Sequence, residues 1–234
     1  MWPPLISLIT PTYNESKNMP ENIRRIQNSL KGYFFEIIIV DDNSPDGCGL
    51  IADELAANYS HIKVMHREGK NGLGTAYKEG FELTSGDIII SMDSDLSHDA
   101  SFLPLLVEAA KDNEIVIGSR LCQGGSIEGR QFHRDFLTYF ANKIIKKFTK
   151  SNINDWTSGF RVYHRDTWIK LMPKVHCNKW DFQFESLYKG KKMGFKIKEV
   201  PITFYERSEG SSKFGLGDML LFIHSFFEVV TNRK

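Results

Sequence analysis

Short apolar runs alternate with segments of helical periodicity through the first half of the chain. Five runs fit buried β-strands: Leu5–Thr10, Phe34–Val40, Ile62–His66, Asp87–Met92 and Glu114–Gly118. Four segments between them fit helices: Asn18–Leu30, Gly49–Tyr59, Gly74–Thr84 and Ser101–Asp112. Strands that are apolar throughout and separated by helices predict an α/β fold, in which a mostly parallel central sheet carries helices on both faces.

The pattern becomes less regular after residue 120. An amphipathic helix is predicted over Phe132–Lys150, a further helix over Trp180–Tyr188 and one strand over Lys196–Tyr205. The glycine-rich segment Gln123–Gly129 is predicted to be a mobile loop, and Asp155–Arg161 a polar turn. No linker, repeat or low-complexity segment interrupts the chain, so we expect a single domain over residues 1–234.

The composition is that of an ordinary globular protein. Hydrophobic residues make up 41% and charged residues 25% of the 234 positions, and a net charge of +1 gives no reason to expect a nucleic acid partner. The three cysteines are widely spaced, which fits a reducing compartment and neither a disulfide framework nor a zinc site. The apolar segment Met219–Phe227 is much shorter than the roughly 20 residues needed to span a bilayer, so we expect no crossing there.

Polar clusters follow three of the predicted strands. They are Thr10–Glu15, Asp41–Ser44 and Asp93–Asp95. In parallel α/β sheets the carboxyl ends of the strands lie at one edge, where ligands bind. We therefore expect the three clusters to share one crevice.

The carboxylates of Asp93 and Asp95 are one residue apart directly after an apolar strand. Bringing like charges so close is costly unless a cation or hydrogen bonds compensate. Mg or Mn would do so, because hard cations take oxygen ligands and bridge carboxylates to phosphates. Ser97 could assist, directly or through water. The alternative is a surface turn, where Asp and Ser are common; the preceding apolar strand favours the metal site.

Two further motifs have both a structural and a functional interpretation. Asp41 and Asp42 either cap the next helix or accept a hydrogen bond from a base or ribose. The Gly72–Gly74 turn with Lys70 either opens a helix or faces a phosphate. Neither a Walker motif nor the dinucleotide fingerprint is present.

Basic residues in the second half also allow two interpretations. Arg207 and Lys213 flank a Ser/Gly loop and are either solvated or positioned to neutralise charge on a leaving group. Lys143, Lys146 and Lys147 form either a solvated helix face or, opposite the aromatic residues of the same helix, a face that suits an anionic membrane.

Taken in order, these segments resemble the family 2 glycosyltransferases with the Rossmann-like GT-A fold. Within that family they are similar to the dolichyl-phosphate mannose synthase and polyprenyl-phosphate glycosyltransferase group. The resemblance is carried by segments that span nearly the whole chain: Thr10–Glu15, Val40–Gly47, Asn71–Ala76, Met92–His98, Gly118–Arg120, Thr157–Arg161, Phe182–Glu185 and Arg207–Lys213. It implies a nucleotide-sugar-binding half over residues 1–120 and an acceptor-binding half over residues 121–234 with membrane-facing segments.

The resemblance implies a role for each candidate residue on the donor side. The nucleotide pocket would be formed by Pro11, Tyr13, Glu15 and Asp41, with Asp42 supporting it. The donor diphosphate would be held by the metal ligands Asp93, Asp95 and Ser97 and covered by Arg207 and Lys213. Of these, Asp95, Arg207 and Lys213 would take part in catalysis. The expected cofactor is Mg or Mn.

Five residues are implied on the acceptor and sugar side. They are Arg120, Arg134 and Thr138 for the acceptor phosphate, and Gln183 and Glu185 for the sugar. The implied reaction is inverting transfer of a hexosyl group, mannose from GDP-mannose or glucose from UDP-glucose, to a polyprenyl or dolichyl phosphate. The alternatives are a family 2 transferase that elongates a soluble glycan or cell-surface polysaccharide, and a nucleotide-sugar-binding subunit without catalysis.

The expected location is cytoplasmic, peripheral on the cytoplasmic face of a membrane. Many relatives continue into transmembrane helices, whereas this sequence ends at Lys234. The resemblance therefore implies a membrane-anchoring partner subunit. The alternatives are docking through Phe132–Lys150 and Met219–Phe227, and a sequence that is one piece of a longer protein.

Overall fold

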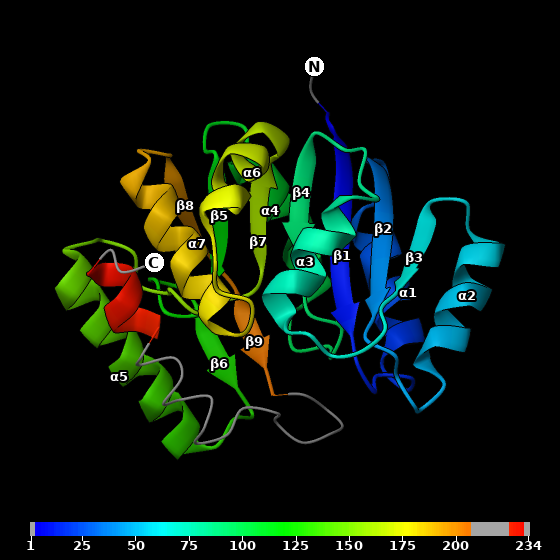
Figure 1. Cartoon of the computed structure of the whole chain (residues 1–234), viewed down its shortest axis with the longest axis horizontal. Helices are drawn as coiled ribbons and strands as arrows, with labels where there is room; N and C mark the ends of the chain where they lie inside the picture. The colour runs from blue at the N-terminus through cyan, green and yellow to red at the C-terminus, as the bar shows by residue number, and fades with distance from the viewer. Residues whose placement is uncertain (1–2, 207–224, 232–234) are drawn as a thin grey trace.

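A seven-stranded sheet in the order β3-β2-β1-β4-β7-β5-β8 organises the chain (Figure 1). The structure is a computed structural model that describes residues 3–206 and 225–231. The strands are β1 (Leu5–Thr12), β2 (Phe34–Asp41), β3 (Ile62–His66), β4 (Ile88–Ser91), β5 (Ile115–Ser119), β7 (Arg161–His164) and β8 (Ile197–Pro201). Only β7 is antiparallel to its neighbours, β4 and β5. The predicted mostly parallel α/β fold is confirmed.

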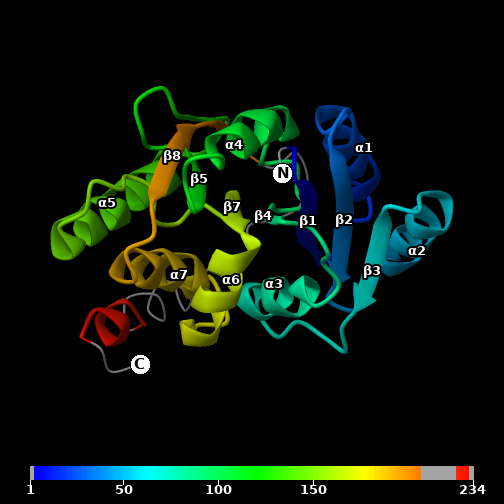
Figure 2. The same ribbon diagram turned by 90° about the horizontal axis from the view of Figure 1, so that it is seen from above.

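Helices cover both faces of this sheet (Figure 2). One face carries α1 (Met19–Ser29), α2 (Cys48–Asn58) and α4 (Leu103–Ala109), with the short 3-10 turn η1 (Ala100–Phe102). The other face carries α3 (Leu73–Phe81), α6 (Arg165–Leu171) and α7 (Asp181–Lys192), with the 3-10 turn η2 (Met172–Lys174). Successive strand residues enter opposite cores, as Leu8 and Ile9 do. Both faces are therefore apolar, which explains the continuous apolar runs.

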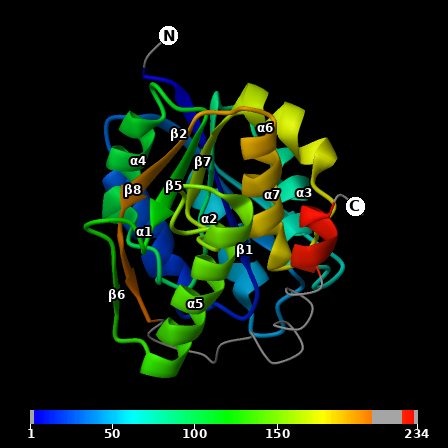
Figure 3. The same cartoon turned by 90° about the vertical axis from the view of Figure 1, so that its left-hand side faces the viewer.

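A small second sheet lies below the carboxyl ends of the parallel strands (Figure 1). It pairs β6 (Ser126–Glu128) with β9 (Thr203–Tyr205) in parallel and leads into the long helix α5 (Phe132–Thr149), which Figure 3 shows in front. The Tyr205 amide donates to the Ser97 carbonyl at 3.0 Å, and Phe204 forms a bridge with His98. The small sheet thus contacts the loop after β4.

Two predicted elements of the second half differ from the structure, and two observed elements were not predicted. The single strand expected over Lys196–Tyr205 is divided into β8 and β9, which belong to different sheets. Ile202 joins them: its amide donates to the Ser119 carbonyl and its carbonyl accepts from the Ser126 amide, both at 3.0 Å. The apolar pattern continues through this corner because Ile202 is buried as well.

The loop predicted over Gln123–Gly129 is wrong where it contains β6, and β7 with α6 was not predicted at all. Both strands are short, with three and four residues. Each is defined by partners distant in sequence: β6 by β9, and β7 by β4 and β5. Strands of this length carry too few residues for a period to be recognised. Most of the predicted Met219–Phe227 segment lies outside the described residues.

Candidate active site

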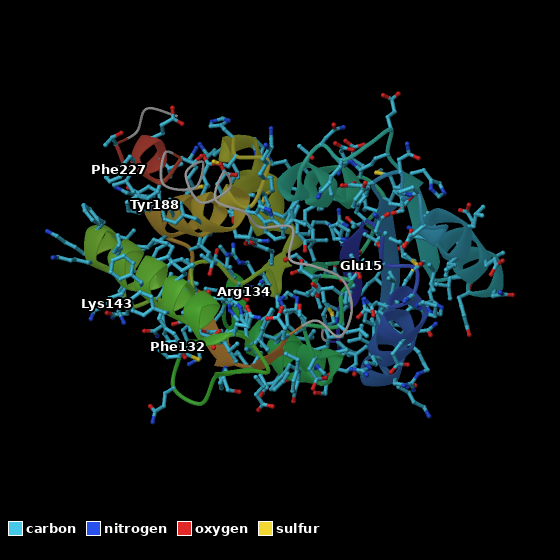
Figure 4. The ribbon with its side chains drawn as sticks, turned by 90° about the horizontal axis from the view of Figure 1, so that it is seen from below. Glu15, Phe132, Arg134, Lys143, Tyr188 and Phe227 are labelled. Atoms are coloured by element: carbon cyan, nitrogen blue, oxygen red, sulfur yellow. The ribbon has the colours of Figure 1, made fainter. Side chains whose placement is uncertain are left out.

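The loops after β1, β2 and β4 meet at one edge of the sheet. The Asp42 amide donates to the Thr12 carbonyl at 3.0 Å, and the Ser94 hydroxyl donates to the Pro11 carbonyl at 2.9 Å. Figure 4 views this edge from below, with Glu15 at the end of β1. The three polar clusters are therefore brought together, as their positions after parallel strands predict.

The loop after β4 holds its two carboxylates in different ways. The Asp93 side chain is 27% exposed, and its Oδ1 accepts a hydrogen bond from the Tyr77 hydroxyl at 3.2 Å. Asp95 is buried, and its Oδ1 accepts from the Ser97 amide at 3.1 Å and the Ser97 hydroxyl at 2.5 Å. Leu96, between Asp95 and Ser97, has a φ of 65°, which makes the turn tight. Asp93 is thus the more accessible carboxylate, and Ser97 shapes the loop around Asp95.

His98 and Tyr77 both contact Asp93. The Asp93 amide donates to His98 Nδ1 at 3.2 Å, and His98 Nε2 lies 3.9 Å from Asp93 Oδ2. Burial lowers the pKa of His98, so this ring is neutral near neutral pH. Burial, and then the neighbouring Asp93, raise the pKa of Tyr77 well above its usual value. Tyr77 therefore remains a hydrogen-bond donor to Asp93.

The acidic pair after β2 is buried. Asp41 Oδ2 accepts from the Ser44 amide at 3.2 Å, while its Oδ1 has no hydrogen-bond partner among the described residues. Asp42 Oδ1 accepts from Arg67 Nη1 at 2.7 Å. Burial raises the pKa of Asp42, although Arg67 opposes this. An unpaired buried acceptor suits a base or sugar donor, which fits the predicted role of Asp41.

Tyr13 and Glu15 belong to the loop after β1, which lies next to the Asp41–Asp42 loop. Lys70 Nζ lies 5.0 Å from the centre of the Tyr13 ring, within the range of a cation–π contact. Glu15 Oε2 accepts from Asn18 Nδ2 at 2.7 Å and is largely buried. Tyr13, directly after β1, is thus a neighbour of the turn before α3.

The predicted acceptor residues lie in the second half. Arg120 is buried and makes a bidentate ion pair with Asp155, with Nε–Oδ2 at 2.7 Å and Nη2–Oδ1 at 2.8 Å. Arg134, at the start of α5, donates through Nη1 to Glu206 Oε1 at 2.6 Å, and Figure 4 shows it on the side of α5 nearer the strands. The Thr138 hydroxyl donates to the Arg134 carbonyl at 3.0 Å. Arg207 and Lys213 lie outside the described residues.

Gln183 and Glu185 lie on α7 and differ in their surroundings. Both amide atoms of Gln183 are buried without a hydrogen-bond partner among the described residues. Glu185 Oε2 accepts from the amides of His176 and Cys177 at 2.8 and 2.6 Å, and Lys189 lies 2.8 Å from its other oxygen. The Glu185 carboxylate thus holds the chain before α7, and its role toward a sugar stays a prediction.

Comparison with known proteins identifies the family. A sequence model described as Glycosyl transferase family 2 matches residues 7–171, well over half of the chain. The chain belongs to glycosyl transferase family 2. The predicted family and the prediction of a glycosyltransferase are confirmed.

Curated relatives of this family 2 glycosyltransferase match it over most of its length. It is 36% identical to an undecaprenyl-phosphate mannosyltransferase of Micrococcus luteus over 89% of this chain and 87% of that protein. It is 38% identical to a polyprenol monophosphomannose synthase of Mycolicibacterium smegmatis, over 88% and 79%. A dolichol-phosphate mannosyltransferase of Pyrococcus furiosus is also 38% identical, but the chain spans only 58% of that protein.

Solved structures share the fold of this glycosyltransferase. A glucosyl-3-phosphoglycerate synthase of Mycobacterium tuberculosis, in complex with Mn2+, UDP-glucose and phosphoglyceric acid, superposes with a TM-score of 0.70 at 19% identity, covering 99% of this chain and 80% of that one. A mannosyltransferase of Pyrobaculum calidifontis, in complex with GDP-Man and Mn2+, gives 0.64 at 16% identity, with coverages of 98% and 70%. The predicted GT-A fold is confirmed.

The carboxylate loop of this glycosyltransferase fits a hard divalent cation. Among residues 3–206 and 225–231, no three His, Cys, Asp or Glu side chains are grouped to hold a metal alone, so Asp93 and Asp95 would need substrate oxygens to complete the shell. Gly159 leaves room here, because an added Cβ would lie 3.4 Å from Asp93 Oδ1 and 3.3 Å from Gln183 Nε2. The accessible Asp93 carboxylate and the Gln183 amide, which has no hydrogen-bond partner among the described residues, suit a cation and its polar ligands.

Sequence reasoning missed Arg67, which lies among the residues predicted for the donor side. Its side chain is 2% exposed, and besides Asp42 it donates to Glu79 Oε2 at 2.9 Å and to the Thr75 hydroxyl at 2.6 Å. Arg67 thereby connects the end of β2 to α3. The signal was available, because Arg67 directly follows a predicted strand, as the other polar clusters do.

Proposed function

We propose that this glycosyltransferase moves a hexosyl group, mannose from GDP-mannose or glucose from UDP-glucose, onto a polyprenyl or dolichyl phosphate with Mg or Mn. The arginine group Arg120, Arg130 and Arg134 near the carboxylate loop is the observation that carries this proposal. Burial lowers the pKa of Arg120, but Asp155 and, after it, Asp93 raise the pKa above its usual value. Asp93 is therefore close enough to act on the Arg120 guanidinium. Relatives named for polyprenol and dolichol phosphate mannosyl transfer, at 36% and 38% identity, support the same acceptor class.

A phosphate acceptor explains how the reaction proceeds without a general base. A monophosphate already carries between one and two negative charges near neutral pH. Its oxygen forms a bond to the anomeric carbon while the bond from that carbon to the donor diphosphate breaks, and the electron pair leaves with the diphosphate. No proton moves, so the protein acts by positioning and by stabilising charge. Attack from the face opposite the leaving group inverts the anomeric configuration.

Each group of side chains then has one task. Asp41 accepts a hydrogen bond from the nucleotide, and Tyr13 and Glu15 line its pocket. Asp93 and Asp95 would hold the divalent cation, which neutralises the charge on the diphosphate when it is bound. Arg134 and Thr138 hold the acceptor phosphate at the other side of the loop, with Arg120 fixed by Asp155 behind them.

A panel of donors and acceptors tests this proposal. GDP-mannose and UDP-glucose are each incubated with farnesyl phosphate, with farnesol or with a soluble oligosaccharide, and products are identified by mass spectrometry. We expect a glycosyl phosphoryl lipid only from farnesyl phosphate, and only when Mg or Mn is present. Transfer to the oligosaccharide with none to farnesyl phosphate would instead support a polysaccharide-elongating enzyme.

We further infer that α5 lies against the membrane that supplies the lipid acceptor. Phe132 and Phe136 are 84% and 57% exposed, and the Phe136 and Phe140 rings stack with centroids 5.9 Å apart. Exposed lysines follow on the same helix, where Figure 4 shows Lys143 along its outer edge. Aromatic and cationic side chains together suit an anionic bilayer surface. No described helix combines the length and apolar character that spanning a membrane requires.

Replacing Phe136 and Phe140 with serine is expected to weaken this association about tenfold, because two aromatic side chains no longer enter the bilayer. Co-sedimentation with vesicles of phosphatidylglycerol and phosphatidylcholine measures the bound fraction. Phe34→Ser is the matched control, because Phe34 is 71% exposed but begins β2, next to the edge strand β3. Equal binding of both variants would contradict the assignment of α5.

A further inference from the structure

Arg130 lies beside the proposed acceptor residues, just before α5, and was not among the predicted site residues. Its side chain is only 14% exposed, and Nη1 donates to the Thr138 hydroxyl at 3.1 Å. Its acidic neighbours are more distant: Asp135 Oδ1 is 3.8 Å from Nη1, and Glu206 Oε2 is 3.9 Å from Nε. These distances exceed those of hydrogen bonds. Among the described residues, Nε has no hydrogen-bond partner.

Glu206 places an anion between two guanidinium groups. Its Oε1 accepts from Arg134 Nη1 at 2.6 Å, while its Oε2 is on the Arg130 side, buried and without a hydrogen-bond partner in the described part of the chain. The Glu206 amide donates to the Glu128 carbonyl at 2.9 Å, so its backbone is held by β6. A carboxylate thus occupies the space between Arg130 and Arg134, but satisfies only one of them.

The charges around this space favour a stronger anion. Arg120 is already paired with Asp155 through both carboxylate oxygens. Burial, and then the nearby Arg120 and Arg134, lower the pKa of Arg130, while Asp135 and Glu206 oppose this. A phosphate carries more charge than a carboxylate and has three acceptor oxygens, so it can bond to both guanidinium groups together.

We propose that Arg130 binds the acceptor phosphate together with Arg134, and that the Glu206 carboxylate occupies the position of this phosphate until the acceptor displaces it. This inference rests on the proposed function. It explains why the Arg130 Nε and a Glu206 oxygen are buried without a hydrogen-bond partner among the described residues. It also gives Glu206 a role in specificity, because a neutral lipid alcohol cannot replace its contact with Arg134.

Steady-state kinetics with farnesyl phosphate and the preferred nucleotide sugar test the proposal. Arg130→Gln is expected to raise the acceptor KM about tenfold or more, since a charge-assisted contact is lost. Arg130→Lys should give a smaller increase. Glu206→Gln should lower the acceptor KM about threefold to tenfold, because the competing charge is gone. The donor KM should stay the same in all three.

Direct binding separates recognition of the phosphate from turnover. Calorimetry with farnesyl phosphate in the absence of donor should reproduce the order of affinities, with Glu206→Gln tightest and Arg130→Gln weakest. Inorganic phosphate should compete weakly with farnesyl phosphate if the headgroup alone is recognised, whereas farnesol should not compete. The matched controls are Arg24→Gln on α1 and Glu82→Gln directly after α3, because both side chains are exposed.

The outcomes distinguish the two proposals. An active enzyme whose acceptor KM and farnesyl phosphate affinity are unchanged by Arg130→Gln overturns the inference and leaves the proposed function intact. A raised acceptor KM in Glu206→Gln overturns the proposal that Glu206 occupies the phosphate position, since it would mean that Glu206 only orients the arginines. A wild-type enzyme that neither binds nor glycosylates farnesyl phosphate overturns the proposed function itself. Thermal unfolding of each variant checks folding, and if Arg130→Gln is unfolded, Arg130→Lys and Glu206→Gln decide.

Discussion

Replacing Asp95 with asparagine should lower turnover about 100-fold or more, because half of the negative charge that holds the cation on the diphosphate is lost. Asparagine keeps the shape of aspartate, and its side-chain oxygen can still accept from the Ser97 amide and hydroxyl. The loop should therefore keep its conformation. The expected loss is one of metal affinity and charge stabilisation, and not one of folding.

The measurement needs a signal besides turnover. Thermal unfolding with Mn and GDP or UDP reports binding, because a ligand that binds only the native state raises the apparent stability. Wild type should be stabilised by the metal and nucleotide together, and Asp95→Asn much less. Asp112→Asn is the matched control, because Asp112 is exposed after α4. Wild-type turnover of Asp95→Asn with Mg or Mn would show that the metal role of Asp95 is wrong.

Replacing Asp155 with asparagine should destabilise the fold by about 3–5 kcal/mol, because it leaves the buried Arg120 guanidinium without its counter-charge. Asp155 has no exposed surface and also accepts from the Thr157 and Ser158 amides, at 3.2 and 3.0 Å. Glu108→Gln is the control, since Glu108 pairs with Lys111 on the surface at side-chain exposures of 58% and 39%. Such an exposed pair contributes about 1 kcal/mol or less. Urea unfolding at pH 7 measures both.

The same variant should change the dependence of stability on pH. Burial alone would raise the pKa of Asp155, but Arg120 and the backbone amides outweigh it, so the pKa is lowered in the folded protein. A lowered pKa contributes stability that is present above the unfolded value of about 3.9 and is lost as the pH falls through the folded value. The wild-type protein should therefore lose this contribution below about pH 4, and Asp155→Asn should lack it. Parallel pH profiles of the two proteins would contradict this.

The sequence was sufficient to bring together the residues predicted for the donor side. The apolar runs before Asp41 and Asp93 are long enough to predict strands, and the carboxyl ends of parallel strands necessarily meet. The same rule applied after Ile62–His66 would have found Arg67. What these residues touch could not be predicted, because contacts such as that between Tyr77 and Asp93 depend on how α3 packs on the sheet.

The residues proposed for the acceptor side were less predictable for a physical reason. They come from the ends of β5 and β9, from the start of α5 and from the loop before β7, which only the folded chain brings together. Glu206 and Arg134 are 72 positions apart, and Arg120 and Asp155 are 35 apart. An ion pair over such a separation leaves no periodic signal in the sequence. The family resemblance indicated Arg134 and Thr138, but gave no indication of Arg130 or Glu206.

The antiparallel strand β7 has a consequence for the order in which the molecule is built. It lies between β4 and β5, although residues 161–164 follow both in the chain. During synthesis the apolar edge of β4 therefore stays open until some 70 further residues have been made. Unpaired strand edges are where chains associate wrongly. The Ser91 hydroxyl, at the end of β4, donates to the Gly159 carbonyl just before β7 at 2.8 Å. Pairing of β7 therefore both closes the sheet and fixes the strand end from which the carboxylate loop begins.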